Sequence, residues 1–389
     1  MTGQLRGQLS VALTWTSPLH LAEVDTLMVA VTNPATDHSS ASADPQRSSG
    51  PKQKAGLKLG FLTRLEVGAD AADSYKFGLD MFTLAEELGF DTGWIAQHHF
   101  LNGDGRLPSA FPFLAAAAQR TKRINLATAI VTLPLEDPLR VAEDAAFVDI
   151  ISGGRLQLGL GTGGDPLSFN AFGKDVNARR EEYAAGFKLI QAALRGEPIR
   201  DTGARMYPTS PSLVDRIWEA TFSEDGGGRI GRNGSGLLLA KTSAHSSDPA
   251  DVVQVPIAET YIRELEALPG PKIAPRVGMS RTVYVAADRA TAMADMRSGI
   301  ERWVEKLSAR GQFPTGLTEE ETHKRIHIHC GHPEEVIASI REDLLFPFST
   351  ELICQVQPGD PTQKQILKSM ELLAKEVAPA LGWRPNRPE

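Results

Sequence analysis

Short apolar runs and helix-like spacings alternate along the chain from residue 57 onward. The run at 57–62 has the length and content of a buried strand. Met81, Leu84 and Leu88 then recur at the spacing of one helix face, and Gly89 follows them as a residue that commonly ends helices. Comparable apolar runs predict further strands at 92–96, 124–131, 155–161, 215–220, 236–240, 275–286 and 349–356.

Helical spacings fall between these strands. They predict helices at 110–120, 138–151, 183–194, 224–233, 252–268 and 288–309, and a closing helix from Ile366 to Val377. Repeated strand–helix units imply a parallel sheet with right-handed crossovers. The eight strands therefore predict an α/β fold, a (β/α)8 TIM barrel over 57–381, rather than the alternative of a doubly wound open sheet. Residues 382–389 are then a C-terminal tail.

Three segments depart from this rhythm. Residues 196–214 carry prolines and predict an irregular excursion. Residues 310–348 are longer than a usual loop, and we interpret them as a lid-like insertion before the eighth strand. Residues 1–56 form an N-terminal extension to which we assign no function. Within it, 32–56 lacks large apolar side chains and is predicted to be disordered, because it buries too little surface to offset its ordering entropy.

Composition narrows the class of protein. The 389 residues carry a net charge of −7, which disfavours nucleic acid as a partner. No run of apolar residues is long enough to predict a membrane span, and the first residues lack the pattern of a signal peptide. Cys330 and Cys354 form neither a disulfide framework nor a CxxC site, which fits a reducing cytosol and predicts a cytoplasmic protein.

The strand ends select candidate site residues, because TIM-barrel active sites lie at the C-terminal ends of the strands. His98 follows the second predicted strand and is our catalytic candidate, since an unperturbed pKa of about 6.5 suits proton transfer. The alternative is a packing histidine at the barrel rim. Its neighbour His99 points to the opposite face of an extended segment, so only one of the two is expected to face the pocket.

Two glycine-rich segments follow later strands. The first, at 159–164, matches G-x-G-x-x-G, but it lies in the fourth unit and no helix opens directly after it. We therefore favour a tight rim around a ligand over a dinucleotide fingerprint. The second starts at Ser223 and opens a short helix, which is typical of an anion site. Glu224 and Asp225 would oppose an anion there, whereas Arg179 and Arg180 could supply positive charge.

A histidine-rich cluster stands in the predicted insertion, with His327, His329, Cys330 and His332. These residue types ligate zinc. The cluster does not follow the first strand, where metal-hydrolase barrels usually place a His-x-His pair. We therefore predict no metal site, and keep a metal-dependent hydrolase as an alternative.

Several ordered motifs resemble the bacterial luciferase-like flavin monooxygenases, the family that also contains coenzyme F420-dependent oxidoreductases. The resemblance runs from about Leu57 to Leu381. Its motifs are AEELGFDTGWIAQHHF (85–100), INLATAIVTLPLEDPLRVAEDAAFVDIISGGRLQLGLGTG (124–163), FGKDVNARREEY (172–183), RIWEATFS (216–223), GSGLLLA (234–240), HPEEVIASIRED (332–343) and KEVAPAL (375–381).

The resemblance implies a flavin at the barrel mouth and a role for each matching residue. His98 corresponds to the family's active-site histidine. Ala129 and Ile130 correspond to a non-prolyl cis peptide under the flavin ring, with Thr128 beside it. The phosphate side is implied at Arg179, Tyr183, Ser223 and Gly226. The chain departs from some relatives at Gly161 and Thr162, where they carry Cys and Arg.

These expectations combine into one function. The chain is expected to be an FMN-dependent monooxygenase that uses reduced flavin and O₂ on a small organic substrate. A separate NAD(P)H:flavin reductase would supply electrons, and the resemblance implies a homodimer. The alternatives are an F420-dependent oxidoreductase that transfers hydride, and a non-catalytic flavin-binding barrel.

Overall fold

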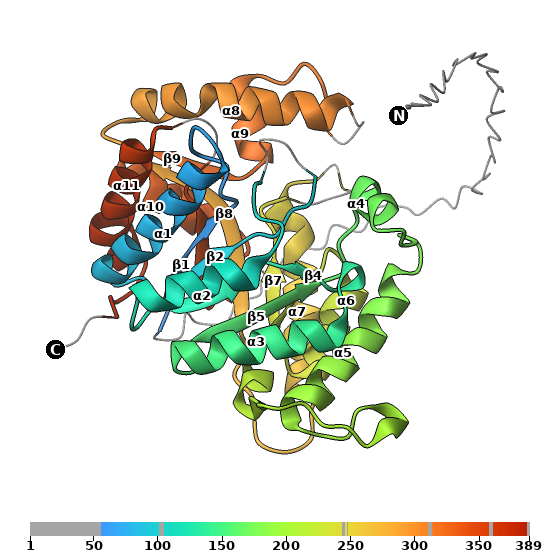
Figure 1. Cartoon of the computed structure of the whole chain (residues 1–389). Coiled ribbons are helices and arrows are strands. Elements are labelled where there is room, and N and C mark those ends of the chain that lie inside the picture. Colours follow the sequence, from blue (N-terminus) through green and yellow to red (C-terminus); the bar gives the residue numbers. More distant parts are fainter. Residues whose placement is uncertain are drawn as a thin grey trace, which may run out of the picture. The chain divides into compact units, whose positions relative to one another are not determined.

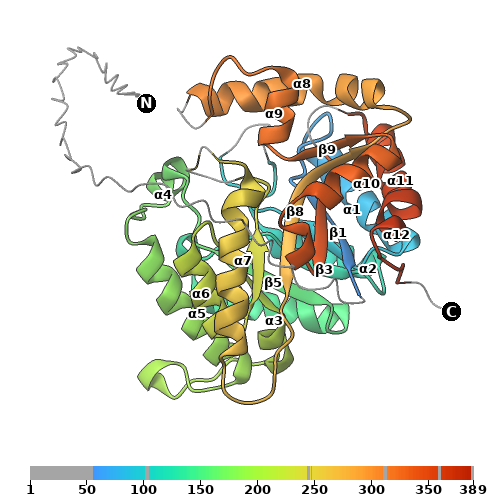
Figure 2. The same cartoon turned by 180° about the vertical axis from the view of Figure 1, so that it is seen from behind.

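The computed structural model describes residues 56–100, 105–242, 246, 248–309, 313–357 and 361–386. The extension predicted at 1–56 therefore lies outside the described residues, apart from Gly56. Figure 1 and Figure 2 show the described part from opposite sides.

Within the described residues, eight parallel strands close into a barrel, which confirms the predicted fold class. Closure is made where the last barrel strand pairs with the first, with Lys58 opposite Glu351. The barrel strands are β1 (Lys58–Thr63), β2 (Thr92–Ile95), β3 (Asn125–Thr128), β5 (Leu156–Gly161), β6 (Ile217–Ala220), β7 (Gly236–Leu239), β8 (Val277–Val285) and β10 (Glu351–Gln355).

Helices surround the barrel (Figure 1). Local sequence sets their ends: the Asp70 side chain accepts a hydrogen bond from Asp73 N at the first helix, which ends at Gly89 with φ of 90°. The helices are α1 (Ala71–Leu88), α2 (Ala110–Arg120), α3 (Pro138–Ser152), α4 (Pro166–Ala171), α5 (Arg179–Arg195), α6 (Glu224–Asn233), α7 (Ala250–Glu266), α8 (Arg289–Ala309) and α11 (Gln363–Leu372), with a π turn at Leu373–Val377 leading into α12 (Ala378–Ala380). Among them, none has the length and apolar content that a membrane span needs.

The third predicted strand is not one strand. The sequence predicts a continuous run over 124–131, whereas the structure divides it into β3 and β4 (Val131–Thr132). A cis peptide bond between Ala129 and Ile130 separates the two. β4 still pairs in parallel with β5, so the chain turns at the cis bond and rejoins the same neighbour.

The insertion at 310–348 contains regular structure that the sequence analysis missed. Its described part forms α9 (Glu319–Arg325), β9 (Ile328–Gly331) and α10 (Pro333–Glu342). β9 pairs in parallel with the second half of β8, starting at Thr282. β7 pairs with the first half of β8, so β9 extends the sheet beyond the end of β7. The segment is thus partly built into the sheet, and its role as a lid stays a prediction.

The barrel domain also extends past its predicted end at Leu381. Trp383 is only 1% exposed and belongs to the main core. Its indole packs near Phe90, and Nε1 donates a hydrogen bond of 2.8 Å to Asp91 Oδ2. The predicted tail at 382–389 therefore begins with a core residue, which the sequence analysis missed because one isolated aromatic has no periodic partner.

Candidate active site at the barrel mouth

The C-terminal ends of the barrel strands meet at one end, which we call the mouth. In both views α4, α8 and α9 gather at this upper end of the barrel (Figure 1, Figure 2). TIM-barrel enzymes place their active sites there. The described loops that follow the strands supply the side chains considered below.

His98 follows β2 and is half-buried. Its backbone N–H donates to Leu107 O at 2.9 Å, and its Nε2 lies 3.4 Å from Nη2 of Arg64, the residue after β1. A guanidinium can only donate hydrogen bonds, so the neutral ring facing it carries its proton on Nδ1. The returning chain holds the ring closely: a Cβ added at Gly105 would lie 2.9 Å from His98 Nδ1.

His99 has different surroundings from His98. Its ring packs edge-on against Phe172 with centroids 4.9 Å apart, and lies near Phe100. Burial lowers the pKa of His99, which favours its neutral form. The two histidines thus have different neighbours, and His98 is the one whose ring lies near the guanidinium of Arg64. That only one of them faces the pocket stays a prediction.

The cis peptide at Ala129–Ile130 lies where the resemblance implied one. Ala129 and Ile130 pack against an apolar layer formed by Trp94, Ala127, Trp218, Leu238 and Ile353. Glycines of β5 make room for this turn. A Cβ at Gly159 would lie 1.9 Å from Thr128 O, and one at Gly161 would lie 2.8 Å from Ile130 Cδ1. The glycines of the GLG segment are therefore explained by the turn opposite them.

Thr128 is fully buried and its hydroxyl is already engaged. Oγ1 donates to Gly159 O and accepts from Gly159 N, both at 2.8 Å. The side chain therefore joins β3 to β5 just before the cis bond. Thr128 therefore helps to hold the turn in its observed conformation. Its hydroxyl is bonded to protein rather than directed at a ligand.

The resemblance implied that Tyr183 contacts the ligand, but its side chain lies below the surface. It is 2% exposed, and its hydroxyl donates to Glu219 Oε2 at 2.8 Å. Burial, followed by the Glu219 carboxylate, raises the pKa of Tyr183 well above its ordinary value. Arg229 stacks over the Tyr183 ring at 5.0 Å and pairs with Glu219, while Asn233 donates to Glu219 Oε1 at 2.8 Å.

Glu219 and Arg229 belong to this buried group, and neither was selected as a candidate from the sequence. Glu219 is fully buried in β6 and accepts all three donors, so it fixes Arg229 on α6. Arg229 keeps a partly exposed side chain, whereas Tyr183 does not. The sequence did contain one signal for this group, which is the charged residue Glu219 inside an otherwise apolar strand.

Ser223 and Gly226 lie at the exposed start of α6. Ser223 Oγ accepts from Gly226 N at 3.2 Å, and Ser223 N donates to Thr221 Oγ1 at 3.2 Å. A Cβ at Gly226 would lie 1.9 Å from Thr221 Oγ1, so only glycine fits this turn. The helix start presents its N–H groups and positive dipole end outward, which suits an anion.

The remaining glycines of α6 serve packing. A Cβ at Gly227 would lie 2.7 Å from Ile257 O, and one at Gly231 would lie 2.5 Å from Tyr261 O, both on α7. Close approach of α6 to α7 therefore requires these glycines. Contacts within the protein therefore account for these glycines, with Thr221 at Gly226 and α7 at Gly227 and Gly231.

Arg179 stands at the first position of α5, half-buried. Its Nη1 donates to Val176 O at 2.6 Å, so one guanidinium nitrogen is held by the preceding turn. Its neighbour Arg180 is exposed. Of the two arginines noted in the sequence, Arg179 is therefore the one with a fixed side chain.

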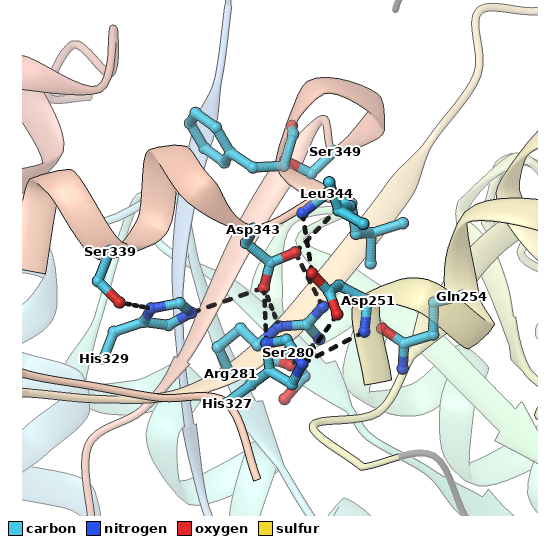
Figure 3. A network of polar contacts seen from close by, with 12 residues as sticks. Asp251, Gln254, Ser280, Arg281, His327, His329, Ser339, Asp343, Leu344 and Ser349 are labelled. Atoms are coloured by element: carbon cyan, nitrogen blue, oxygen red, sulfur yellow. Dashed lines mark hydrogen bonds and ion pairs between the residues drawn. The ribbon is translucent and has the colours of Figure 1, made fainter. Parts of the chain in front are cut away.

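The histidine-rich cluster forms a buried ionic network (Figure 3). Arg281 and Asp343 are fully buried and form two hydrogen bonds, at 2.6 and 3.2 Å. His327 Nε2 lies 3.0 Å from Asp251 Oδ1, and its Nδ1 lies 3.4 Å from Asp343 Oδ2. Burial alone would raise the pKa of Asp343, but Arg281 and the two histidines, His327 and His329, hold it far below its ordinary value.

His329 belongs to the same network, whereas His332 caps the start of α10. His329 Nδ1 lies 2.8 Å from Ser339 Oγ, and burial lowers the pKa of His329. Within the described residues, no cluster of three ligating side chains fits a metal ion. The network joins β9 to β8, α7 and the segment after α10, so these histidines anchor the insertion.

Comparisons with known proteins agree with this geometry. The sequence model of the luciferase-like monooxygenase family matches residues 57–344. Limonene 1,2-monooxygenase of Rhodococcus erythropolis is 28% identical over 80% of this chain and 82% of its own. The crystal structure of monooxygenase RslO1 from Streptomyces bottropensis aligns with a TM-score of 0.71 at 27% identity, covering 83% of this chain and 99% of that one.

A further solved structure shares the fold at lower identity. It is the oxygenating constituent of 3,6-diketocamphane monooxygenase from Pseudomonas putida, in complex with FMN. Its TM-score is 0.67 at 19% identity, and the alignment covers 83% of this chain and 98% of that one. The match of the family model over most of the chain establishes that this protein belongs to the luciferase-like monooxygenase family, whose members are oxidoreductases built on this barrel.

Proposed function

We propose that this protein is an FMN-dependent monooxygenase that oxidises a small organic substrate at the barrel mouth. The observation that carries the proposal is the set of donors at the starts of α6 and α5, in a chain whose residues 57–344 match the luciferase-like monooxygenase family. The apolar layer that includes Ala129 and Ile130 would accommodate the apolar part of a ring system. The FMN complex of a structural relative supports the choice of FMN.

The donors at the start of α6 and α5 fit the phosphate end of FMN. Ser223 and the first-turn N–H groups of α6 would donate hydrogen bonds to it, and Arg179 would add positive charge. Tyr183 would act indirectly, by holding Glu219 and Arg229 in place. Bound FMN in its reduced form would supply the electrons that activate O₂.

His98 would move a proton at the mouth. Its Nδ1 carries the proton of the neutral ring, because Nε2 faces Arg64. That proton could be donated to an oxygen atom of a bound reactant. Half-burial between Arg64 and the returning chain at Gly105 keeps the ring in one orientation.

The proposal has two further parts concerning partners. Electrons would come from a separate NAD(P)H:flavin reductase, so an unrelated reductase should replace the natural one in an assay.

A homodimer is supported by α3, where Phe147, Ile150 and Ile151 are 57%, 49% and 36% exposed on one helix. Sedimentation of the Phe147→Asp variant as a monomer would support that contact, and unchanged sedimentation would contradict it.

Isotope incorporation tests the proposed reaction. The protein is incubated with FMN, a flavin reductase, NAD(P)H and ¹⁸O₂, with limonene, decanal and camphor as substrates. A product that gains one ¹⁸O atom supports a monooxygenase. Substrate reduction that requires F420 and proceeds without O₂ would instead establish hydride transfer. Tight flavin binding with neither reaction on any substrate offered would favour the non-catalytic alternative.

A further inference from the structure

Gln97 is a buried amide beside the catalytic candidate that the flavin proposal does not use. It directly precedes His98 and is 8% exposed. Its side chain makes three hydrogen bonds, each to a different segment of the chain. A buried amide is costly unless its donors and its acceptor are bonded. Three bonds to separate segments therefore make this side chain a fixed point at the mouth.

The oxygen of the Gln97 amide binds the segment that follows β3. β2 and β3 pair as far as Ile95 and Thr128, and the N–H of Ala129 still donates to Ile95 O at 2.7 Å. Beyond this point β4 pairs with β5, and the N–H of Thr132 in β4 donates to Gln97 Oε1 at 3.1 Å. The side chain thus continues the connection between these two parts of the chain past the end of β3.

The nitrogen of the same amide binds two acceptors. Nε2 of Gln97 donates to Pro108 O at 2.9 Å and to Glu136 Oε1 at 2.7 Å. Glu136 follows the short 3-10 turn Leu133–Leu135, which comes directly after β4. Both partners can only accept, so an amide turned over would set its oxygen against a carbonyl and a carboxylate. The three bonds therefore allow one orientation of the amide.

The bond to Pro108 closes the loop that carries His98. The His98 N–H donates to Leu107 O at 2.9 Å, so two successive residues are both bonded to the returning chain. At Gly105 this returning chain comes so close that an added Cβ would lie 2.9 Å from His98 Nδ1. The place of the His98 ring therefore depends on the returning chain, which Gln97 fastens to the segment after β3.

We propose that Gln97 is a positioning residue that acts through His98, because its amide fastens the loop around His98 to the segment after β3 and so fixes the ring. This inference deepens the proposed function and rests on it for the proton transfer assigned to His98. Glutamine suits the position because a glutamate would set a second carboxylate against Glu136. The competing interpretation is that Gln97 contributes to the stability of the fold and to nothing else.

Nuclear magnetic resonance of the His98 ring tests the proposal without flavin. The full chain is labelled with ¹⁵N-histidine, and His98→Ala identifies the His98 signals by their loss. At alkaline pH a neutral ring held as one tautomer gives two well-separated nitrogen signals, because one nitrogen carries the proton and the other does not. We expect Gln97→Met to reduce this separation, since a loosened ring exchanges between tautomers. An unchanged separation would overturn the proposal.

A double-mutant cycle on turnover separates positioning from stability. Gln97→Met should lower kcat by about tenfold or more with little change in KM, because a small displacement of a catalytic group is costly. In the His98→Ala background the same change should lower kcat by less than about twofold, since the two residues act as a unit. Equal losses in the two backgrounds would assign Gln97 to the fold alone and overturn the proposal.

Exchanging the two partners gives a test based on charge. Gln97→Glu should lower kcat because two carboxylates then face each other. Its kcat relative to that of the unaltered chain should rise as the pH falls, since the two carboxylates then share a proton. Adding Glu136→Gln should recover part of the loss, because the exchanged pair again has a donor and an acceptor. Recovery by neither route would overturn the proposal.

Gln157→Met is the matched control. Gln157 accepts a hydrogen bond of 3.0 Å from Trp218 Nε1, and it is the second residue of β5, at the end of the barrel away from the mouth. Its loss should leave the His98 signals and kcat unchanged, and thermal melts show whether each variant is folded. If Gln97→Met does not fold, Gln97→Glu compared at two pH values decides in its place.

The two kinds of readout distinguish this inference from the proposed function. A His98 tautomer that depends on Gln97, in a chain that binds no flavin, would support the positioning role and refute the proposed function. Flavin-dependent turnover that is the same in Gln97→Met and in the unaltered chain would leave the proposed function standing and overturn this inference.

Discussion

Two clusters of charged side chains differ in how their charges are balanced. In the network of Figure 3, Arg281 and His327 face carboxylates, and Asp343 accepts from both of them. At the mouth, Arg179 is half-buried with one nitrogen bonded to Val176 O, and the start of α6 beside Ser223 is exposed. The first cluster is closed by paired charges inside the protein, whereas the second presents donors to the outside.

The difference separates structural from functional charge. Buried charges that satisfy one another hold elements in a fixed register, and removing one partner leaves the other uncompensated. Donors that stay exposed at a helix start can bind an anion. By this criterion the histidine-rich cluster belongs to the fold, and Arg179 with the start of α6 belongs to the candidate site.

The largest expected effect comes from opening the closed cluster. Asp343→Asn should lower the free energy of unfolding by about 3–5 kcal/mol, because the fully buried Arg281 loses its carboxylate. Denaturant unfolding measures the change. Asp80→Asn, which removes an exposed pair with Arg120, should cost no more than about 1 kcal/mol. Equal small losses in both variants would contradict the account of the network.

The next effect concerns the catalytic candidate. His98→Ala should reduce turnover by about 10²-fold, because general acid–base catalysis contributes at least that much, while FMN affinity stays nearly unchanged. Steady-state kinetics and flavin titration measure the two quantities. His99→Ala is the matched control and should reduce turnover much less. Unchanged turnover in His98→Ala would exclude it from the mechanism.

A smaller effect tests the phosphate end of the site. Arg179→Ala should weaken FMN about tenfold and riboflavin hardly at all, since only FMN carries a phosphate. Arg180→Ala removes the exposed neighbour and should leave both affinities unchanged. If Arg179→Ala weakens FMN and riboflavin equally, the assignment of Arg179 to the phosphate is wrong.

The barrel could be predicted from the sequence because its signals are local and repeated. Alternating strands and helices fix the parallel topology, and α6 begins and ends at the predicted residues 224 and 233. β9 could not be found in this way. It has four residues, includes His329, and becomes a strand only because it pairs with Thr282–Val285. Tertiary pairing of this kind leaves no periodic pattern.

The position of the candidate site could be predicted from the sequence, but the contacts between its side chains could not. The strand-end rule selects His98, whereas its approach to Arg64 joins residues of two different strands. Tyr183 shows the opposite failure, since a matching residue type did not reveal that its hydroxyl is buried against Glu219.

The most direct test of the central claim is a binding comparison on the full chain. FMN, riboflavin and F420 are titrated against the protein, in oxidised and reduced forms, and the dissociation constants are compared. The account predicts that reduced FMN binds most tightly and that riboflavin is weaker because it lacks the phosphate. Tight binding of F420 with no affinity for FMN, or no affinity for any of the three, would contradict it.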